Sequence, residues 1–439
     1  MLIETIYIHC NCIDKEVLFV LNIILLKLKT DGLGVELDCK KEFKFVHLYR
    51  FTRFMIASAF VLCYATNNDS RETNVIYPVL YGNYQRNGFM ESETSAKGEI
   101  DWFIEVGSPS GKAVLLVEGH NYYLYKHNVL YRFSMDTEII WHKSLRGWMD
   151  PVIQNKKIYF APSSRLCRIN QDKETEETGF HIPDINNFTS IIFFKPHSEN
   201  YLVQTFMQNE TGRIGDYVRI KTKFHIIDSS GNLKYTDSEA AQHAPAVITN
   251  DDSVLVVITG SGEIRLINPI TGTLINRSNL KRRGARIASI DMFDNLLILG
   301  NTTTPGERLL MKTTLDGSIV WEYLLSTANI RCFVQPPASD RNGRVYFIHA
   351  NTLLRINKDG ELEREYSLQN DSDFQFVTVL NDNSVLVTSG NMLMHLDPSG
   401  DEVFTLHLDE RERIAAPPVV DNDGGVMLAT LSGRVYRIK

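Results

Sequence analysis

Short apolar runs separated by polar turns recur along most of the chain. Each copy predicts a strand marked by proline, a second strand after a polar turn, a third after a Gly or Ser turn, and a fourth after a turn of Asp or Asn followed by Gly. Runs such as KIYF (157–160), RVYFI (344–348), SVLVT (384–388) and GVMLA (425–429) are almost wholly apolar, as expected for strands covered on both faces. A repeat of four strands predicts the blades of a β-propeller.

The turn before each fourth strand begins with an acidic or amide residue that marks one copy. The markers are spaced by 34, 58, 40, 48, 41 and 40 residues, at Asp136, Asn170, Asp228, Asn268, Asp316, Asn357 and Asp397. An eighth, incomplete copy ends the chain, so that residues 98–439 divide into eight units of about 43 residues. We therefore predict an all-β, eight-bladed propeller of four-stranded blades, with seven blades as the alternative because the second copy is short.

The marker residues have a structural interpretation. Asp or Asn bonds its own backbone two residues on, and the Gly that follows takes a positive φ. NPITG (268–272), DSSG (228–231), NKDG (357–360) and DPSG (397–400) are thus expected to be hairpin turns. Trp102, Trp141 and Trp321 follow turns at equivalent places, and we expect them to pack between blades.

The last copy lacks its fourth strand. It ends with the third strand, residues 434–438, whereas residues 98–106 (GEIDWFIEV) form a single strand with the Gly-x-x-x-Trp form of GSIVW (317–321). A first strand that completes the last repeat closes a ring. We therefore predict that residues 98–106 pair with residues 434–438.

A basic and apolar segment precedes the repeats. Lys44, Arg50 and Arg53 stand before an apolar core, and the small residue Ala65 follows it, which is the layout of a signal peptide. Cys63 is a second candidate, for lipid modification. The sequence divides into an N-terminal extension (1–47), a signal peptide or membrane anchor (48–65), a linker that leads into the ring (66–97) and the propeller (98–439).

Composition excludes some classes of function. The net charge of -7 lacks the basic footprint that nucleic-acid binding needs. The six cysteines are scattered and form neither a disulfide framework nor a CxxC zinc pattern; Cys167 and Cys332 are expected to be buried apolar residues. HExxH, P-loop, GxGxxG and GxSxG motifs are absent from the sequence, so we predict no catalytic site.

The repeats resemble those of the pyrroloquinoline-quinone-like propeller superfamily. The resemblance lies in MDPVIQNKKIYFAPSSRLCRIN (149–170), APAVITNDDSVLVVITGSGEIRLINPITGTLI (244–275) and APPVVDNDGGVMLATLSGRVYRI (416–438), and it extends over residues 77–439. It implies a propeller fold. The superfamily includes quinone-dependent dehydrogenases and non-enzymatic propeller lipoproteins of outer-membrane assembly, and this chain is nearest in character to the latter.

The resemblance also suggests what a dehydrogenase would need. Such enzymes use two adjacent cysteines, a calcium ion and an Asp base, whereas this chain has no adjacent cysteines. NPITG keeps Thr271 and Gly272 but has Ile275 and Asn276 where the family places Trp. We therefore expect neither pyrroloquinoline quinone nor calcium as a cofactor.

The resulting hypothesis is an exported, monomeric scaffold that binds a protein partner in the cell envelope. It would be periplasmic or secreted, or anchored to the membrane through its N-terminal segment, and would not bind nucleic acid. The alternatives are a quinone-dependent dehydrogenase or arylsulfotransferase-like enzyme, and a sensor or ligand-binding ectodomain.

Two loops that depart from the repeat are the candidate partner-binding sites. The longest interval contains Arg213 and Tyr217, and the segment NLKRRGAR (279–286) contains Arg282, Arg283 and Arg286. Arg and Tyr are residue types that often dominate contact energies, and a basic run suits an acidic partner. A solvated loop is the alternative interpretation for both.

The leader gives a first prediction. We expect the mature protein to begin near Thr66, or at Cys63 if that residue is acylated, because the basic, apolar and small segments follow in the order of a signal peptide. Mass spectrometry of the protein isolated from its native envelope measures the new N-terminus. An intact chain that starts at Met1 in the cytosol would contradict the prediction.

Overall fold

The structure is a computed structural model, in which the repeats belong to one compact unit, Glu72–Lys439. It describes residue 90 and residues 92–106, 113–118, 121–145, 151–154, 157–160, 165–170, 176–181, 188–193, 200–208, 220–240, 246–259, 261–280, 287–301, 307–325, 336–368 and 375–439. The predicted extension, the predicted signal peptide with Cys63, and most of the linker lie outside the described residues.

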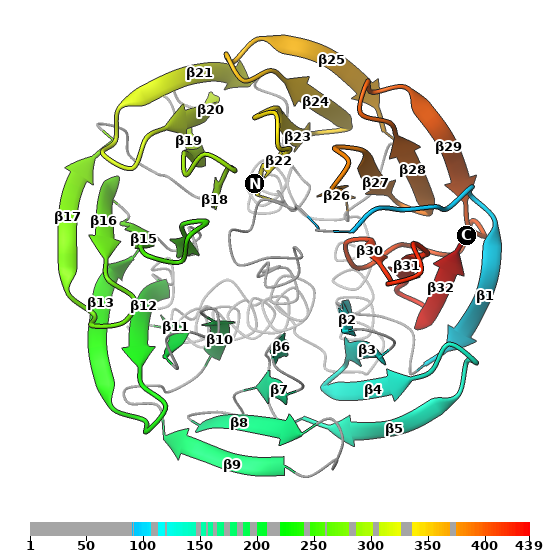
Figure 1. The fold of residues 1–439 in the computed structure, drawn as a ribbon, viewed down its shortest axis with the longest axis horizontal. Helices are drawn as coiled ribbons and strands as arrows, with labels where there is room; N and C mark the ends of the chain where they lie inside the picture. Colours follow the sequence, from blue (N-terminus) through cyan, green and yellow to red (C-terminus); the bar gives the residue numbers. More distant parts are fainter. Residues whose placement is uncertain are drawn as a thin grey trace, which may run out of the picture. The chain divides into compact units, whose positions relative to one another are not determined.

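Strands make up the regular structure of the described residues. Thirty-two strands form eight four-stranded antiparallel sheets, which stand as blades around one axis (Figure 1). In each blade the first strand lies nearest the axis and the fourth lies at the rim. The prediction of an all-β propeller with four-stranded blades is confirmed, and the described sheets number eight.

The strands follow in chain order within each blade. Blades 1 to 4 are β2 (Ala113–Glu118), β3 (Asn121–Lys126), β4 (Val129–Phe133) and β5 (Ile139–Ser144); β6 (Val152–Gln154), β7 (Lys157–Phe160), β8 (Arg165–Asn170) and β9 (Glu176–His181); β10 (Phe188–Phe193), β11 (Tyr201–Gln208), β12 (Ile220–Ile227) and β13 (Leu233–Ala240); and β14 (Val247–Ile248), β15 (Leu255–Ile258), β16 (Glu263–Ile267) and β17 (Leu274–Asn279).

The second half of the ring repeats the arrangement. Blades 5 to 8 are β18 (Ile287–Ile290), β19 (Leu296–Asn301), β20 (Arg308–Thr313) and β21 (Ile319–Leu325); β22 (Ala338–Ser339), β23 (Val345–His349), β24 (Thr352–Ile356) and β25 (Leu362–Ser367); β26 (Gln375–Val379), β27 (Val385–Ser389), β28 (Met392–Leu396) and β29 (Glu402–His407); and β30 (Val419–Val420), β31 (Val426–Ala429) and β32 (Arg434–Ile438) with β1 (Ile100–Glu105).

Blade 8 is completed by the first strand of the chain. β1 pairs antiparallel with β32, from Ile100 opposite Ile438 to Glu105 opposite Arg434. The main-chain pairing continues past both strands, because the amides of Glu99 and Lys439 each donate to the other residue's carbonyl, at 3.0 and 2.8 Å. The prediction that residues 98–106 pair with residues 434–438 is confirmed.

Residues 92–99 form a strap that leads to β1. The strap runs from near the axis to the rim between blades 7 and 8 (Figure 1). Asn381 of blade 7 donates its amide to the carbonyl of Ser92 at 3.0 Å, and Ser95 donates its amide to the carbonyl of Gly424 of blade 8 at 3.1 Å. The strap therefore joins the two blades by main-chain hydrogen bonds before the ring closes.

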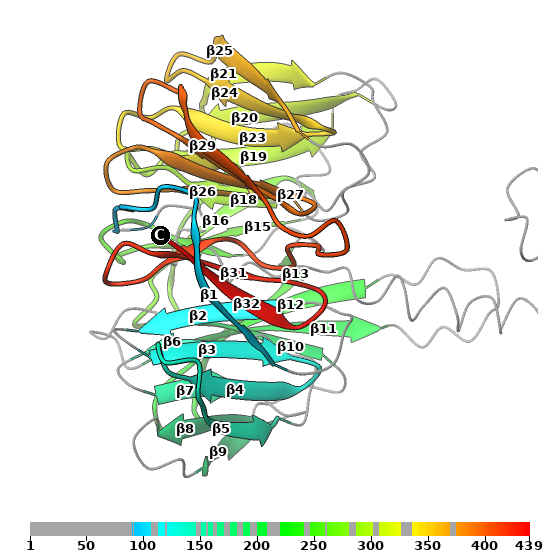
Figure 2. The same cartoon turned by 90° about the vertical axis from the view of Figure 1, so that its right-hand side faces the viewer.

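The antiparallel order places two turns of every blade on one face of the ring. The turn between the first and second strands is called the inner turn. The turn between the third and fourth strands is called the outer turn. Both turns lie on the left side in Figure 2. The outer turns have the predicted chemistry. Asp228 Oδ1, for example, accepts from the amides of Ser230 and Asn232 at 3.0 and 2.8 Å. Gly231 then has a φ of +89°.

Aromatic residues of the fourth strands pack on the outer turn of the next blade. A Cβ added to Gly360 would lie 2.7 Å from Trp321, and one added to Gly400 would clash with the hydroxyl of Tyr366. Trp321 Nε1 also donates to the carbonyl of Lys358 at 3.1 Å, and the Tyr366 hydroxyl donates to the carbonyl of Gly400 at 2.9 Å. Glycine is needed here both for its positive φ and for the space that it leaves.

The other two tryptophans of the repeat also lie between blades. Trp102 of blade 8 meets the rings of Tyr122 and Phe133 of blade 1 edge-on, at centroid distances of 6.4 and 6.5 Å. Trp141 of blade 1 belongs to an apolar cluster shared with Ile158 of blade 2. The predicted role of the three tryptophans is confirmed.

The first strands are joined near the axis by hydroxyl groups. Ser289 of blade 5 donates to the carbonyl of Pro337 of blade 6 at 2.7 Å, and Thr378 of blade 7 donates to the carbonyl of Pro418 of blade 8 at 3.1 Å. Proline lacks an amide hydrogen but keeps its carbonyl acceptor. The prolines that mark the repeat in the sequence therefore receive hydrogen bonds between blades.

Closure predicts the effect of removing the first strand. A chain that starts at Ser108 lacks β1, which leaves β32 with an unpaired edge, and we expect it to aggregate and to melt at a lower temperature than the full chain. Light scattering and thermal unfolding measure both effects. A chain that starts at Ser92 keeps the strap and β1 and is the matched control. Equal stability and solubility of the two truncated chains would reject closure by β1.

Candidate functional site

One position of the third strand is basic in most blades. It stands opposite the second strand and, in most blades, directly before a shift in the register with the fourth. Six blades have a basic residue or histidine at this position: Arg132, Arg168, Lys312, Arg355, His395 and Arg437. These side chains are candidates for a functional site because buried charges need specific partners.

Buried aspartates of the inner turns supply some of the partners. Lys312 Nζ lies 2.7 Å from Asp291 Oδ2, and Arg437 Nε lies 2.6 Å from Asp421 Oδ2. Asp291 and Asp421 are no more than 1% exposed. Each carboxylate begins an inner turn and also accepts hydrogen bonds from amides of that turn, as Asp421 does from Gly425 at 2.8 Å. The ion pairs therefore fix the third strand to the inner turn of its own blade.

The Arg437 cluster lies at the closure of the ring. Arg437 Nη1 lies 2.6 Å from Asp101 of β1, and Lys439 Nζ lies 2.9 Å from the same carboxylate. Hydrogen bonds from Lys439 and then from Arg437 lower the pKa of Asp101 below its ordinary value. Burial, followed by the nearby Asp421 carboxylate, raises the pKa of Tyr122 of blade 1 to about 12. These charges hold the two ends of the chain together.

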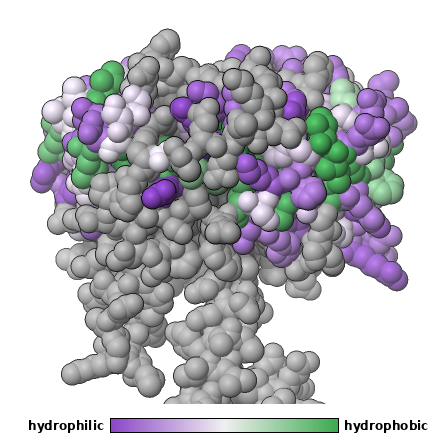
Figure 3. Space-filling view, turned by 90° about the horizontal axis from the view of Figure 1, so that it is seen from below, coloured by the Kyte–Doolittle hydropathy of each residue, from purple (hydrophilic) through white to green (hydrophobic). Residues whose placement is uncertain are grey.

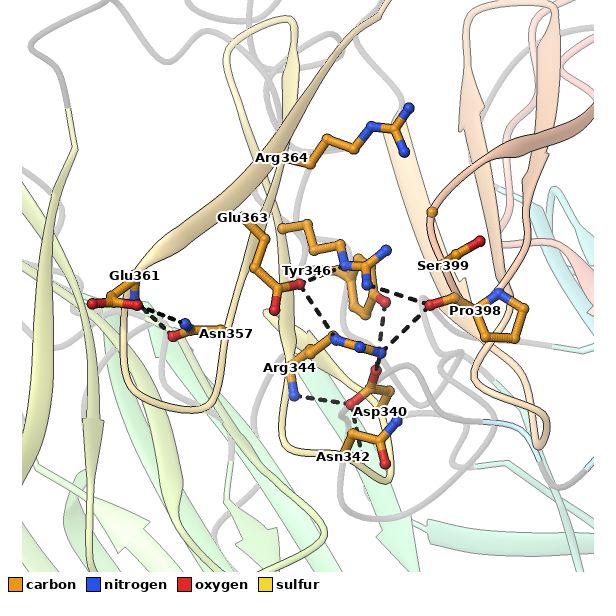
Figure 4. Close-up of polar contacts among 12 residues, drawn as sticks. Asp340, Asn342, Arg344, Tyr346, Asn357, Glu361, Glu363, Arg364, Pro398 and Ser399 are labelled. Atoms are coloured by element: carbon orange, nitrogen blue, oxygen red, sulfur yellow. Dashed lines mark hydrogen bonds and ion pairs between the residues drawn. The ribbon is translucent and has the colours of Figure 1, made fainter.

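The Arg355 cluster joins blades 6 and 7 (Figure 4). Arg355 Nε lies 2.8 Å and Arg344 Nε 3.3 Å from Glu363 Oε2, and Arg344 Nη1 lies 3.5 Å from Asp340 Oδ2. Both arginines also donate to the carbonyl of Pro398 in the outer turn of blade 7, at 3.3 and 3.4 Å. Burial raises the pKa of Asp340. The cluster balances two cations against two carboxylates and stabilises the junction between the blades.

A separate buried charge links blades 8 and 1. Lys126 is 1% exposed, and its Nζ donates to the carbonyl of Leu431 at 2.6 Å. Burial lowers the pKa of Lys126 to about 8, against the opposing effect of Glu412. Glu412 in turn accepts from the hydroxyl of Ser432 at 2.6 Å. This group too bridges neighbouring blades.

His395 is the exception in the series. It is 6% exposed, and neither of its ring nitrogens has a hydrogen-bond partner. Its ring lies against Phe404, at a centroid distance of 5.4 Å. Burial lowers the pKa of His395, and the carboxylates of Asp382 and Asp397 oppose that effect. The histidine occupies the place of a paired cation without having a partner.

These groups contribute to the stability of the ring. The inner-turn carboxylates of Asp291 and Asp421 are paired with Lys312 and Arg437. In the part of the chain that the structure describes, no group of three or more His, Cys, Asp or Glu side chains could hold a metal ion. No helix among those residues is long and apolar enough to cross a membrane.

The predicted partner-binding residues are not placed by the structure. Arg213 and Tyr217 belong to the connection between β11 and β12, and Arg282, Arg283 and Arg286 to that between β17 and β18; all five lie outside the described residues. Cys167 is buried, as expected. The aspartates of the inner turns were not singled out from the sequence. A sequence signal exists in two blades, where an Asp directly follows a proline-marked strand, at Asp340 and Asp421.

Comparison with known proteins finds similarity in structure and not in sequence. No protein-family model matches the chain, and no curated protein matches it. Quinohemoprotein alcohol dehydrogenase from Comamonas testosteroni is 10% identical with a TM-score of 0.57, covering 82% of this chain and 79% of its own. Sqt1 from Saccharomyces cerevisiae is 10% identical with a TM-score of 0.56, covering 79% and 97%.

A third solved structure is similar over nearly its whole length. BamB from Moraxella catarrhalis is 11% identical with a TM-score of 0.49, covering 77% of this chain and 98% of its own. At these identities the comparisons bear on the fold. The dehydrogenase and Sqt1 structures support the propeller fold.

The isolated His395 predicts acid sensitivity. Because the pKa of His395 is lowered in the folded protein, the unfolded chain binds a proton more readily than the folded chain does. The contribution of His395 to the free energy of unfolding is therefore fully present above pH 6.5 and is lost as the pH falls below that value. We expect His395→Leu, which copies Leu266 at the same position of blade 4, to reduce the fall in stability between pH 7 and 5 by at most about 1.4 kcal/mol per pH unit. Denaturant unfolding at several pH values measures the slope.

The exposed His407 supplies the control for this experiment. His407→Gln, which removes an exposed histidine from the same blade, is measured beside His395→Leu. If His395→Leu and the wild-type chain lose stability in parallel below pH 6.5, the buried histidine is not the source of the acid sensitivity.

Proposed function

We propose that this chain is a non-enzymatic scaffold that binds protein partners in the cell envelope. The proposal includes export through the N-terminal segment, because that segment has the sequence layout of a signal peptide. The ring would be the part that partners contact. The buried ion pairs of the ring and its exposed apolar side chains support this function.

The observation that carries the proposal is the exposure of large apolar side chains at the rim. All but two of the exposed large apolar residues in the described part of the chain lie on fourth strands; the two exceptions, Ile270 and Phe293, lie in turns. On β21, Ile319, Val320 and Leu324 are 48%, 49% and 58% exposed. Contiguous apolar surface marks interaction sites, and β21 has three such side chains on one strand.

The apolar side chains are distributed over the ring and do not form one continuous face. Figure 3, which views the ring from the side, shows hydrophobic residues set between hydrophilic ones. A free fourth strand also offers unpaired main-chain groups to a partner. A surface with several small apolar areas suits a protein that contacts partners at more than one place.

The buried charges support the same proposal. Asp421 with Arg437, Asp291 with Lys312, and Asp237 with Arg265 of the next blade are paired at 2.6 to 2.8 Å. Carboxylates that are paired with cations inside the ring are engaged in structural contacts. Two of these pairs join parts of one blade, and the Asp237–Arg265 pair joins two neighbouring blades.

The predicted binding loops give the test of this function. We expect the mature chain, immobilised, to capture a specific protein from an envelope extract. Replacing Arg213 and Tyr217 by Ala, or Arg282, Arg283 and Arg286 by Ala, should reduce capture several-fold while the melting temperature stays within a few degrees. Quantitative mass spectrometry of the captured proteins measures the effect.

An enzymatic assay is run beside the capture experiment. The chain is incubated with pyrroloquinoline quinone, calcium and a primary alcohol, and reduction of an electron-accepting dye is followed. We expect no reduction above the protein-free rate. Quinone-dependent turnover would reject the scaffold in favour of a dehydrogenase, and unchanged capture by both loop variants would show that partners bind elsewhere on the ring.

A further inference from the structure

The inner turns of blades 4 to 8 share one geometry, which allows their residues to be compared position by position. In each turn the amide of the fourth residue donates to the carbonyl of the first, at 2.9 to 3.2 Å. The fourth residue has a positive φ in all five turns. The third residues are Asp251, Phe293, Asn342, Asp382 and Asp423. Phe293 is therefore the only apolar residue at a position that is otherwise Asp or Asn.

Phe293 is strongly exposed. It is 61% exposed, the largest fraction of any large apolar residue in the described ranges. An Asp or Asn at this place is soluble and favours the turn, whereas a phenylalanine exposes apolar area and contributes no turn hydrogen bond through its side chain. Phe293 packs against Gly343 of the next blade, but most of its side chain remains exposed and is available to a partner.

The surroundings of Phe293 hold its ring in place. Its amide donates to Asp291 Oδ1 at 2.9 Å, and Lys312 Nζ, paired with Asp291, lies 5.9 Å from the centroid of the ring. On the other side, a Cβ added to Gly343 of blade 6 would lie only 3.1 Å from Phe293 Cε2. A side chain held in this way loses little conformational freedom when a partner covers it.

Two cationic side chains, Arg341 and Lys358, lie on the blade 6 side of the Phe293 aromatic ring. The same added Cβ at Gly343 would lie 3.4 Å from Lys358 Cβ, so Phe293 and Lys358 both lie close to Gly343. The Lys358 side chain is 68% exposed, and Arg341 is exposed. Arg341 stands where the other four inner turns have Asn250, Met292, Asn381 and Asn422. The aromatic ring and the added positive charge occur together on adjacent turns.

We propose that Phe293, Arg341 and Lys358 form a docking surface for an acidic, extended segment of a partner protein. An aromatic or aliphatic side chain of the segment packs on Phe293, and its carboxylates face Arg341 and Lys358. Aromatic and Arg residues dominate contact energies at interfaces, and opposite charges direct the approach and the register of the partner. The inference rests on the proposed scaffold function and assigns it a surface.

The charges around this surface favour a peptide over a nucleic acid. Asp251, Asp382 and Asp423 occupy the third position of other inner turns on the same face. A long polyanion that followed the face would meet these carboxylates, whereas a short acidic segment can place its carboxylates at Arg341 and Lys358 without crossing those turns. Lys358 already pairs with Asp359 at 3.0 Å, but both side chains are largely exposed, and such a pair is easily exchanged.

The test uses a displayed library of random dodecapeptides, selected on the full chain. Recovered peptides are labelled, and their dissociation constants are measured by fluorescence polarisation. The variants are taken from equivalent positions of the repeats: Phe293→Asp follows Asp251, Arg341→Asn follows Asn250, and Lys358→Ser follows Ser229 of another outer turn. Ile270→Asp is the matched control, because Ile270 is also in a turn and is 58% exposed.

We expect the recovered peptides to combine acidic residues with one large apolar residue. Phe293→Asp should weaken their binding at least tenfold, and the Arg341→Asn and Lys358→Ser double variant should weaken it several-fold and remove most of its salt dependence. Ile270→Asp should bind within twofold of the wild-type chain. Melting temperatures within a few degrees of wild type establish that each variant is folded.

Several outcomes would overturn the docking surface. These are recovery of no peptide, recovery of basic peptides, or equal binding by wild type and Phe293→Asp. Binding of an oligothymidylate that Phe293→Asp abolishes would reassign the surface to single-stranded nucleic acid. Peptides that bind all variants equally would reject this surface alone, whereas failure of envelope capture together with quinone-dependent turnover would reject the scaffold itself.

Discussion

The ring depends on contacts from each blade to the next, because main-chain ladders run only within a blade. The recurring contact is an aromatic side chain of a fourth strand laid on the glycine of the next outer turn, as Trp321 lies on Gly360 and Tyr366 on Gly400. The ring nitrogen or hydroxyl then donates to a carbonyl of that turn. Glycine thus has two functions at one position, since it permits the turn and admits the neighbour.

Buried ion pairs make this packing more specific. Arg437 draws Asp101 of the first strand and Asp421 of the same blade together, and Arg355 with Arg344 reaches the next blade through the carbonyl of Pro398. A paired charge in the interior contributes little net stability, but an unpaired one is costly. The pairs therefore favour one way of joining the blades over others, and His395 occupies the equivalent position of blade 7 without such a pair.

Much of the architecture could be predicted from the sequence because turn chemistry is local. The Asp-to-Gly turns set the spacing of the copies, and the single strand at residues 98–106 matched the missing strand of the last copy. The inner-turn aspartates were harder to recognise, since their partners, such as Lys312 for Asp291, come from a different strand of the fold. The unusual character of Phe293 could not be recognised from the sequence alone. It depends on the shared geometry of the inner turns, in which the other four have Asp or Asn at the same position.

The pairing of β1 with β32 also has a consequence for how the chain is made. Asp101 and Arg437 are 336 residues apart in sequence, so the first strand leaves the ribosome long before its partner exists. Until the last residues are released, blade 8 cannot form its fourth strand pairing, and both β1 and the facing side of blade 1 stay open. Contacts of such long range form late and expose apolar strands to aggregation. Synthesis of this protein therefore includes an extended interval in which most blades can be complete while the ring is still open.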